Sequence, residues 1–100
     1  MTTRAEREIA ELEGLFRGLA HRVRRHIMMV VEAGGGRVSA GAIADRFAHT
    51  WPTTSRHLKV LEASGLLQTE TVGRERFYSI DKDLLFRVGR GWFDNFNEQS

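Results

Sequence analysis

One short segment combines the hydroxyl, imidazole and cationic side chains that recognise DNA. Its polar members are Thr53, Ser55, Arg56, His57 and Lys59. On a helical wheel, Arg56 and Lys59 lie opposite Leu58 and Leu61, so one side can be buried while the cations face outward. Arginine can bond bidentately to guanine in the major groove, and hydroxyls can reach base edges or phosphates. The segment therefore predicts a DNA-reading helix, although an ordinary solvated face carries the same residue types.

Two helices joined by a short turn are expected to position this segment, over residues 39–64. The first would be capped by Ser39, and its apolar residues recur at helical spacing. These residues are Ala40, Ile43, Ala44 and Phe47. Thr50 is the expected N-cap of the second helix, and Pro52 falls in its first turn, where a missing N–H costs nothing. Thr54, one turn before Leu58, extends the buried side, and Gly65 ends the helix.

A hairpin with a basic tip follows at residues 66–80. Residues 66–72 and 76–80 predict its strands, and Gly73-Arg74-Glu75 predicts a three-residue loop. Arg74 and Arg76, at the tip, can contact phosphates or the narrow minor groove. A hairpin directly after a helix-turn-helix predicts a winged helix, a mainly α fold with a small β-hairpin. Val38 is placed to add a short strand to that hairpin.

The same residues resemble a known family. Residues 54–67 read Thr-Ser-Arg-His-Leu-Lys-Val-Leu-Glu-Ala-Ser-Gly-Leu-Leu, and residues 73–80 read Gly-Arg-Glu-Arg-Phe-Tyr-Ser-Ile. Together they resemble the ArsR/SmtB family of bacterial winged-helix repressors. Residues 15–28 are similar to the family's second-helix signature, Leu-Ala, a capping turn and then Arg-Arg-x-Ile. His21 and Arg22 depart from it, because the family usually has an acidic or amide cap and a proline there.

The resemblance covers about residues 12–80 and implies both a topology and an activity. The implied order of elements is α-α-α-α-β-β-α, with the first and last helices forming a homodimer. Such a dimer would bind double-stranded DNA at an operator of two-fold symmetry, with half-sites one helical turn apart, and would repress transcription. A winged-helix protein-interaction module that lacks DNA binding is the alternative interpretation, since a fold does not fix a function.

Both ends of the chain carry apolar residues at helical spacing, which predicts dimerisation helices at 4–19 and 81–97. The expected interface residues are Ile9, Leu12, Phe16, Leu85, Val88, Trp92, Phe93 and Phe96. A chain of 100 residues has little other core to cover so many aromatic rings, so a second subunit would bury them. The competing interpretation is that the last helix packs only on its own domain.

The charge distribution agrees with this division. Residues 1–13 have two Arg against four Glu, net −2, and residues 81–100 have three basic against four acidic residues, net −1. Residues 14–80 have ten basic against five acidic residues, net +5. The basic middle segment is expected to contact phosphate, and the slightly acidic end segments are expected to contact each other.

Metal and thiol chemistry are not expected. The chain has no cysteine, which excludes disulfides, thiolate metal sites and thiol-based switches. The four histidines appear scattered, with His21 and His26 on one predicted helix, His49 in the turn and His57 on the DNA-reading helix. We therefore expect no metal site and no cofactor. Whether a small-molecule effector exists is left open.

Catalysis and membrane insertion are not expected either. No serine has the Gly-x-Ser-x-Gly setting of a nucleophile, and Gly34-Gly35-Gly36 lacks the Gly-Lys-Ser/Thr ending of a phosphate loop. No apolar run approaches the length of a membrane span, and the N-terminus has no apolar core of a signal peptide. The sequence thus predicts one cytoplasmic domain over residues 1–100, with no membrane partner and no enzymatic activity.

Overall fold

The computed structural model describes residues 1–97, so residues 98–100 of the predicted domain lie outside the described part. Its elements are α1 (Arg4–Leu19), α2 (Arg22–Ala33), β1 (Arg37–Ser39), α3 (Ala40–Asp45), α4 (Trp51–Ala63), β2 (Leu67–Val72), β3 (Glu75–Ile80), α5 (Lys82–Leu84), the π-helix η1 (Leu85–Arg90) and α6 (Gly91–Asp94). This is the expected winged helix-turn-helix order, with β1 added and the last helix divided into three segments.

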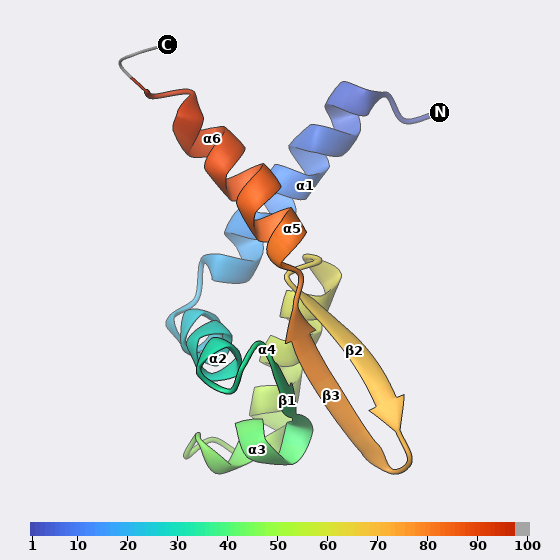
Figure 1. Ribbon diagram of the computed structural model, residues 1–100, viewed down its shortest axis with the longest axis vertical. Helices are drawn as coiled ribbons and strands as arrows, with labels where there is room; N and C mark the ends of the chain where they lie inside the picture. Colours follow the sequence, from blue (N-terminus) through green and yellow to red (C-terminus); the bar gives the residue numbers. More distant parts are fainter. Residues whose placement is uncertain (98–100) are drawn as a thin grey trace.

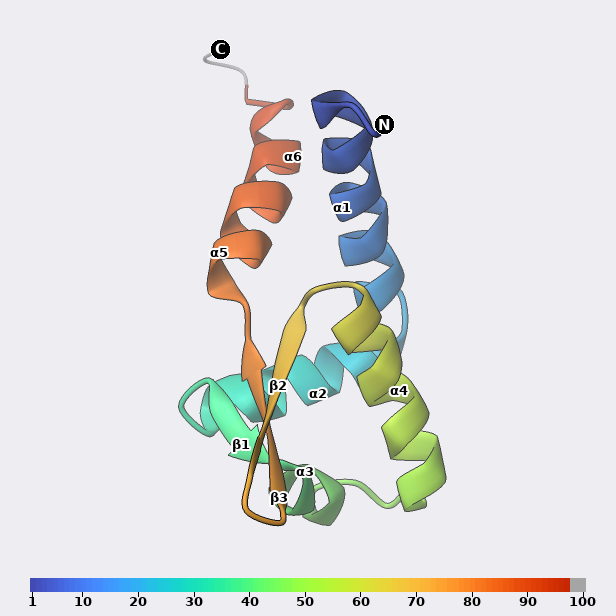
Figure 2. The same ribbon diagram turned by 90° about the vertical axis from the view of Figure 1, so that its right-hand side faces the viewer.

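The molecule measures 45 × 34 × 22 Å and has two distinct ends. At one end, α1 crosses the stretch from α5 to α6, and we call this pair the helical end (Figure 1). Residues 22–80 form the other end, the winged end, in which α2, α3 and α4 lie on one side of a small sheet (Figure 2). None of the helices described is long and apolar enough to cross a membrane.

The sheet is antiparallel with the order β1-β3-β2. Val38 pairs with Tyr78, which confirms the expected third strand. Val72 pairs with Glu75, so the hairpin loop has two residues, Gly73 and Arg74, and the predicted three-residue loop is wrong. Gly73 has a φ of 63°, and a glycine with positive φ at the first loop position permits the tight turn that matches the twist of the strands.

A single apolar core joins the two ends. It consists of Leu15, Ile27, Met28, Val31, Ile43, Leu58, Leu61, Leu66, Leu67, Tyr78 and Val88. The predicted buried side of α4 is confirmed, because Thr54, Leu58 and Leu61 are all fully buried. Helix α1 packs closely on the end of α4, where a Cβ on Gly14 would lie 3.4 Å from the Ser64 carbonyl oxygen. The small residues of α1 thus bring the helical end against the DNA-reading helix.

The helix starts are fixed by local side-chain contacts. Ser39 caps α3 as expected, since its hydroxyl accepts a hydrogen bond from the Ala42 N–H at 3.1 Å. Thr50 stands at the N-cap position of α4, but its hydroxyl donates to the Thr53 hydroxyl instead of capping. His21 is the N-cap of α2 and not part of that helix, because its Nδ1 accepts from the Val23 N–H.

Candidate nucleic-acid interface

Helix α4 presents a polar face on the side away from its buried residues. Arg56 and Lys59 are exposed, while Thr53 and Ser55 are half-buried. This exposure follows directly from the helical period, because the three buried positions of α4 recur on the opposite side. The geometry allows the two cations to reach a ligand without disturbing the core.

The wing lies beside this face. In Figure 2, the start of α4 and the tip of the β2–β3 hairpin lie at the same lower end of the molecule. Arg74 occupies the hairpin loop and Arg76 lies on β3, and both are exposed. A hydrogen bond with Tyr78 raises the pKa of Arg76. The structure therefore brings the start of the predicted DNA-reading helix and the tip of the wing to one end.

His57 differs from the other predicted residues, because the fold directs it toward α2. Its ring is half-buried, with its centroid 4.4 Å from that of His21, and its Nδ1 lies 3.3 Å from Nη1 of Arg24. Burial lowers the pKa of His57, and the neighbouring His21, Arg24, His49 and Arg56 lower it further. His57 is therefore neutral near pH 7.

This contact corrects the prediction that the histidines are scattered. His21 and His57 are far apart in sequence, and only the packing of the α1–α2 turn against α4 brings them together. Among residues 1–97, no group of three or more histidines and carboxylates is close enough to hold a metal ion.

Trp51 is a surface residue that the sequence reasoning missed. It is the first residue of α4, it is 43% exposed, and it borders a cavity of about 260 Å³ lined by Ala40, Gly41 and Ala44 of α3. A search for polar residues overlooks it. The available signal was its position, since Trp51 continues the stripe of Thr54 and Leu58 by one turn at the very start of the helix, where the core no longer covers it fully.

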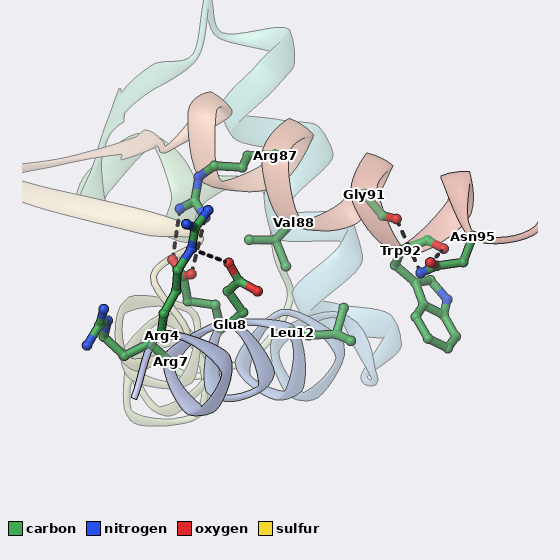
Figure 3. A pocket seen from close by; sticks show the side chains of 10 residues that line it. Arg4, Arg7, Glu8, Leu12, Arg87, Val88, Gly91, Trp92 and Asn95 are labelled. Carbon is green, nitrogen blue, oxygen red and sulfur yellow. Dashed lines mark hydrogen bonds and ion pairs between the residues drawn. The ribbon is translucent and has the colours of Figure 1, made fainter. Parts of the chain in front are cut away.

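The helical end forms a second candidate surface, of a different character. A cavity of about 630 Å³ lies between α1 and the last helix, and Leu12 and Val88 face each other across it (Figure 3). At its edge, Arg87 donates two hydrogen bonds to Glu11, at 2.8 and 3.1 Å. Hydrogen bonding to Arg87 lowers the pKa of Glu11.

Most of the predicted interface residues are exposed at this end. They include Ile9, Phe16, Trp92, Phe93 and Phe96, whereas Leu12 and Leu85 are half-buried. Phe16 meets Trp92 edge to face at 5.8 Å, and Trp92 meets Phe96 at 5.2 Å. Val88 is the exception, since it is already buried in the core of its own chain. The rings of Phe16, Trp92 and Phe96 therefore form a row of contacting, exposed aromatic side chains.

The fold and the basic face of α4 define a winged helix-turn-helix protein, and the comparisons agree. A family model described as a helix-turn-helix domain matches residues 19–70. The transcriptional repressor SdpR of Bacillus subtilis (strain 168) is 27% identical over 85 residues, which cover 85% of this chain and 91% of the relative.

Solved structures show the same likeness. The ArsR family transcriptional regulator RHA00566 superposes with a TM-score of 0.76 at 27% identity, covering 99% of this chain and 95% of that one. An ArsR-like transcriptional regulator from Rhodococcus sp. RHA1 gives a TM-score of 0.64 at 29% identity, covering 88% of each chain. The chain therefore belongs to the helix-turn-helix domain family, as a winged DNA-binding transcriptional regulator of the ArsR type. The relative and the solved structures named above are all described as transcriptional regulators or repressors.

Proposed function

We propose that the chain is a single winged helix-turn-helix domain that acts in the cytoplasm as a homodimeric repressor. It binds an operator of two-fold symmetry and blocks transcription. The similarity to the SdpR repressor over most of both chains supports the repressor role. The placement in the cytoplasm follows from the partner, since the operator is chromosomal DNA.

The observation that carries this proposal is the common placement of the start of α4 and the tip of the β2–β3 hairpin at one end of the molecule (Figure 2). In this arrangement Arg56 reads a base in the major groove, and Lys59 holds a backbone phosphate. Thr53, Ser55 and His57 add base or phosphate contacts. Arg74 and Arg76 anchor the wing on the flanking backbone or in the minor groove.

Trp51 completes the surface of this interface. The N-terminal residues of a recognition helix are the ones that contact base edges, and the exposed ring of Trp51 lies at this position. The methyl group of thymine is the apolar feature of the major groove, and an indole can pack against it. Trp51 therefore contributes shape and apolar contact where Arg56 contributes hydrogen bonds.

The second copy of the chain covers the helical end. Phe93 is 70% exposed and Phe96 is 67% exposed, and together with Ile9, Phe16 and Trp92 they form one surface across two helices. Contiguous apolar surface of this kind is typical of protein interfaces, and a two-fold dimer buries the same surface on both subunits. Leu85 lies half-buried at the same junction, and Val88 supports the surface from beneath.

The direct experiment is footprinting on the intergenic DNA that flanks the gene, with gel shifts on the protected fragment. We expect two protected half-sites about one helical turn apart, bound by a dimer. The same mixture analysed by sedimentation gives the stoichiometry. Absence of specific protection, with the protein folded and dimeric, would contradict the proposal and favour the protein-interaction module.

A further inference from the structure

Two imidazoles meet where the winged end joins α1. His21 ends the turn after α1 and caps α2, and His57 belongs to the recognition helix. Their ring centroids are 4.4 Å apart and their planes are inclined by 46°. The two rings come from separate elements, and each could rotate away into solvent. Their contact therefore requires that other groups hold each ring in place.

The hydrogen bonds fix which nitrogen of each ring carries the proton. The Val23 N–H donates to Nδ1 of His21 at 3.1 Å, so that nitrogen is the acceptor. Arg24 lies 3.3 Å from Nδ1 of His57 through its Nη1, and a guanidinium can only donate. Both Nδ1 atoms are therefore unprotonated. In their neutral forms, His21 and His57 both carry the proton on Nε2.

Arg24 is itself firmly held. Its Nε donates to the Gly18 carbonyl oxygen and its Nη2 to the Arg17 carbonyl oxygen, both at 2.9 Å. These carbonyls belong to the last turn of α1, where helix carbonyls lack partners and a cation is favoured. The third guanidinium nitrogen is left for His57. Arg24 thus fixes the His57 ring relative to α1.

The remaining nitrogen of His57 faces solvent in a basic surrounding. Among residues 1–97 no buried side-chain nitrogen or oxygen lacks a partner, and Nε2 of His57 has none in the protein, so this atom reaches solvent. The groups that perturb His57 are His21, Arg24, His49 and Arg56, all of them bases. An N–H donor surrounded only by bases suits an anion, and phosphate is the anion that a recognition helix meets.

We propose that His21 and His57 donate Nε2–H hydrogen bonds to one phosphate of the DNA backbone, with Arg24 as the positioning residue for His57. The contact joins the α1–α2 turn to the recognition helix on a single phosphate, and so sets how α4 enters the groove. It rests on the proposed DNA-binding function and adds His21 and Arg24 to the residues that serve it.

The test is a scan of the operator with single uncharged methylphosphonates, at a pH where both histidines are neutral. At one position in each half-site the replacement should weaken wild-type binding about tenfold, the value of a hydrogen bond to a charged acceptor. At that position the replacement should weaken binding by the His21→Ala, His57→Ala double variant less than about twofold, and binding by each single variant less than that by wild type, since each single variant keeps one of the two hydrogen bonds. His26→Ala is the matched control, because His26 contacts Phe47 instead. In this variant the methylphosphonate should weaken binding as much as it does in the wild type.

The positioning role of Arg24 is tested through the tautomer and the pKa of His57. An arginine that only stabilised the fold would change neither. Nitrogen chemical shifts should show the Nε2–H tautomer of His57 in the wild type. In Arg24→Ala that preference should be lost and the pKa of His57 should rise, because a donor to the neutral ring and a nearby cation are gone. Arg24→Lys should resemble Arg24→Ala, since a compact ammonium lacks the planar fork whose three separate nitrogens reach two carbonyls and an imidazole.

The outcomes separate this proposal from the proposed function. The proposed contact predicts one operator position at which both histidine variants become less sensitive to the methylphosphonate. If wild type protects an operator and no such position exists, the phosphate contact is wrong. An Nδ1–H tautomer of His57 in the wild type would refute the role of Arg24, even where the Arg24 variants fail to fold. Failure of the proposed function is distinct, because wild type would then protect no operator at all.

Discussion

The winged end and the helical end of the molecule differ in how much apolar surface they expose. The winged end buries its apolar residues, and its exposed large apolar side chains are isolated, at Met29, Trp51 and Val72. The helical end instead exposes six large apolar side chains, Ile9, Phe16, Phe86, Trp92, Phe93 and Phe96, and among them the rings of Phe16, Trp92 and Phe96 contact in a row. The comparison teaches that the exposed apolar surface of this chain is concentrated at the helical end, which is the surface that the proposed dimer would cover.

The charges follow the same division. At the helical end, Glu11 and Arg87 form an ion pair at 2.8 Å. In the described part of the winged end, Arg56, Lys59 and Arg74 form no ion pair. Unpaired cations on an exposed face keep their attraction for phosphate, while paired charges add little long-range field. The two ends are therefore suited to different partners.

The largest effect should come from truncating the aromatic surface. Trp92→Ala should weaken dimerisation by about 3–5 kcal/mol if a partner buries the ring fully. Operator affinity should fall with it, since one half-site supplies only part of the contact energy. Sedimentation equilibrium over a range of concentrations measures the change. Met29→Ala, an exposed apolar residue of the winged end, is the control and should leave the dimer intact. A wild-type protein that is monomeric at micromolar concentration would contradict the difference between the ends.

A smaller and more selective effect is expected on the α4 face. Arg56→Ala should cost about 1–3 kcal/mol per subunit on the operator and relax preference at one base pair of each half-site. The dimer should be unaffected, because Arg56 is remote from the helical end. Gel shifts on the operator and on variants of single base pairs measure both quantities. Unchanged affinity and selectivity would show that α4 is not the reading helix.

Lys59→Ala provides the contrast within the same face. It should weaken specific and non-specific DNA about equally, because a phosphate contact carries no sequence information. The dependence of log affinity on log salt should lose roughly one unit of slope for each contact removed. Selective loss of operator binding would instead assign Lys59 to a base.

The contact between the ends can be tested through Gly18. A Cβ there would lie 2.7 Å from Cδ1 of Leu66 and 2.8 Å from Oγ of Ser64, so Gly18→Ala forces these side chains or α1 to shift. We expect a loss of stability of about 1–3 kcal/mol, as for other overpacked sites. Gly41→Ala is the control, since its Cβ would meet only Oγ of Ser39 at 4.0 Å. Thermal unfolding of both variants measures the difference, and equal stabilities would show that the junction accommodates the added methyl group.

The smallest expected effect is a pH dependence at the helical end. Arg87 lowers the pKa of Glu11, so this pair stabilises the fold above the ordinary carboxyl range, and the contribution is lost as the pH falls through the lowered value. The effect is small because both side chains are partly solvated. Unfolding of wild type and Glu11→Gln should differ near about pH 7 and converge near about pH 3. A difference that grows on acidification would refute this sign.

The fold was predictable where one-dimensional patterns decide it. The period of Thr54, Leu58 and Leu61 identifies the buried side of α4, and Ser39 identifies the start of α3. The hairpin register was not predictable, because Glu75 lies beside Val72 only once the turn at Gly73 is known. The burial of Val88 was assigned to a partner, since spacing alone does not say which chain covers a residue.

The predictability of the site residues has a similar limit. Arg56 and Lys59 follow from the wheel, because the periodicity of α4 determines their exposure. The contacts of His57 with His21 and Arg24 depend on how α4 packs against the start of α2, and no local pattern records that packing. Trp51 was missed because the search was for hydrogen-bonding side chains.

The π-helix from Leu85 to Arg90 also bears on how chain length can vary in related proteins. A π turn holds one residue more than the α turn it replaces, so it shifts every later side chain by about 100° around the axis. Removing one residue there would restore an ordinary α-helix and rotate Trp92 away from Phe16. In this stretch a change of length by one residue is therefore more damaging than many substitutions.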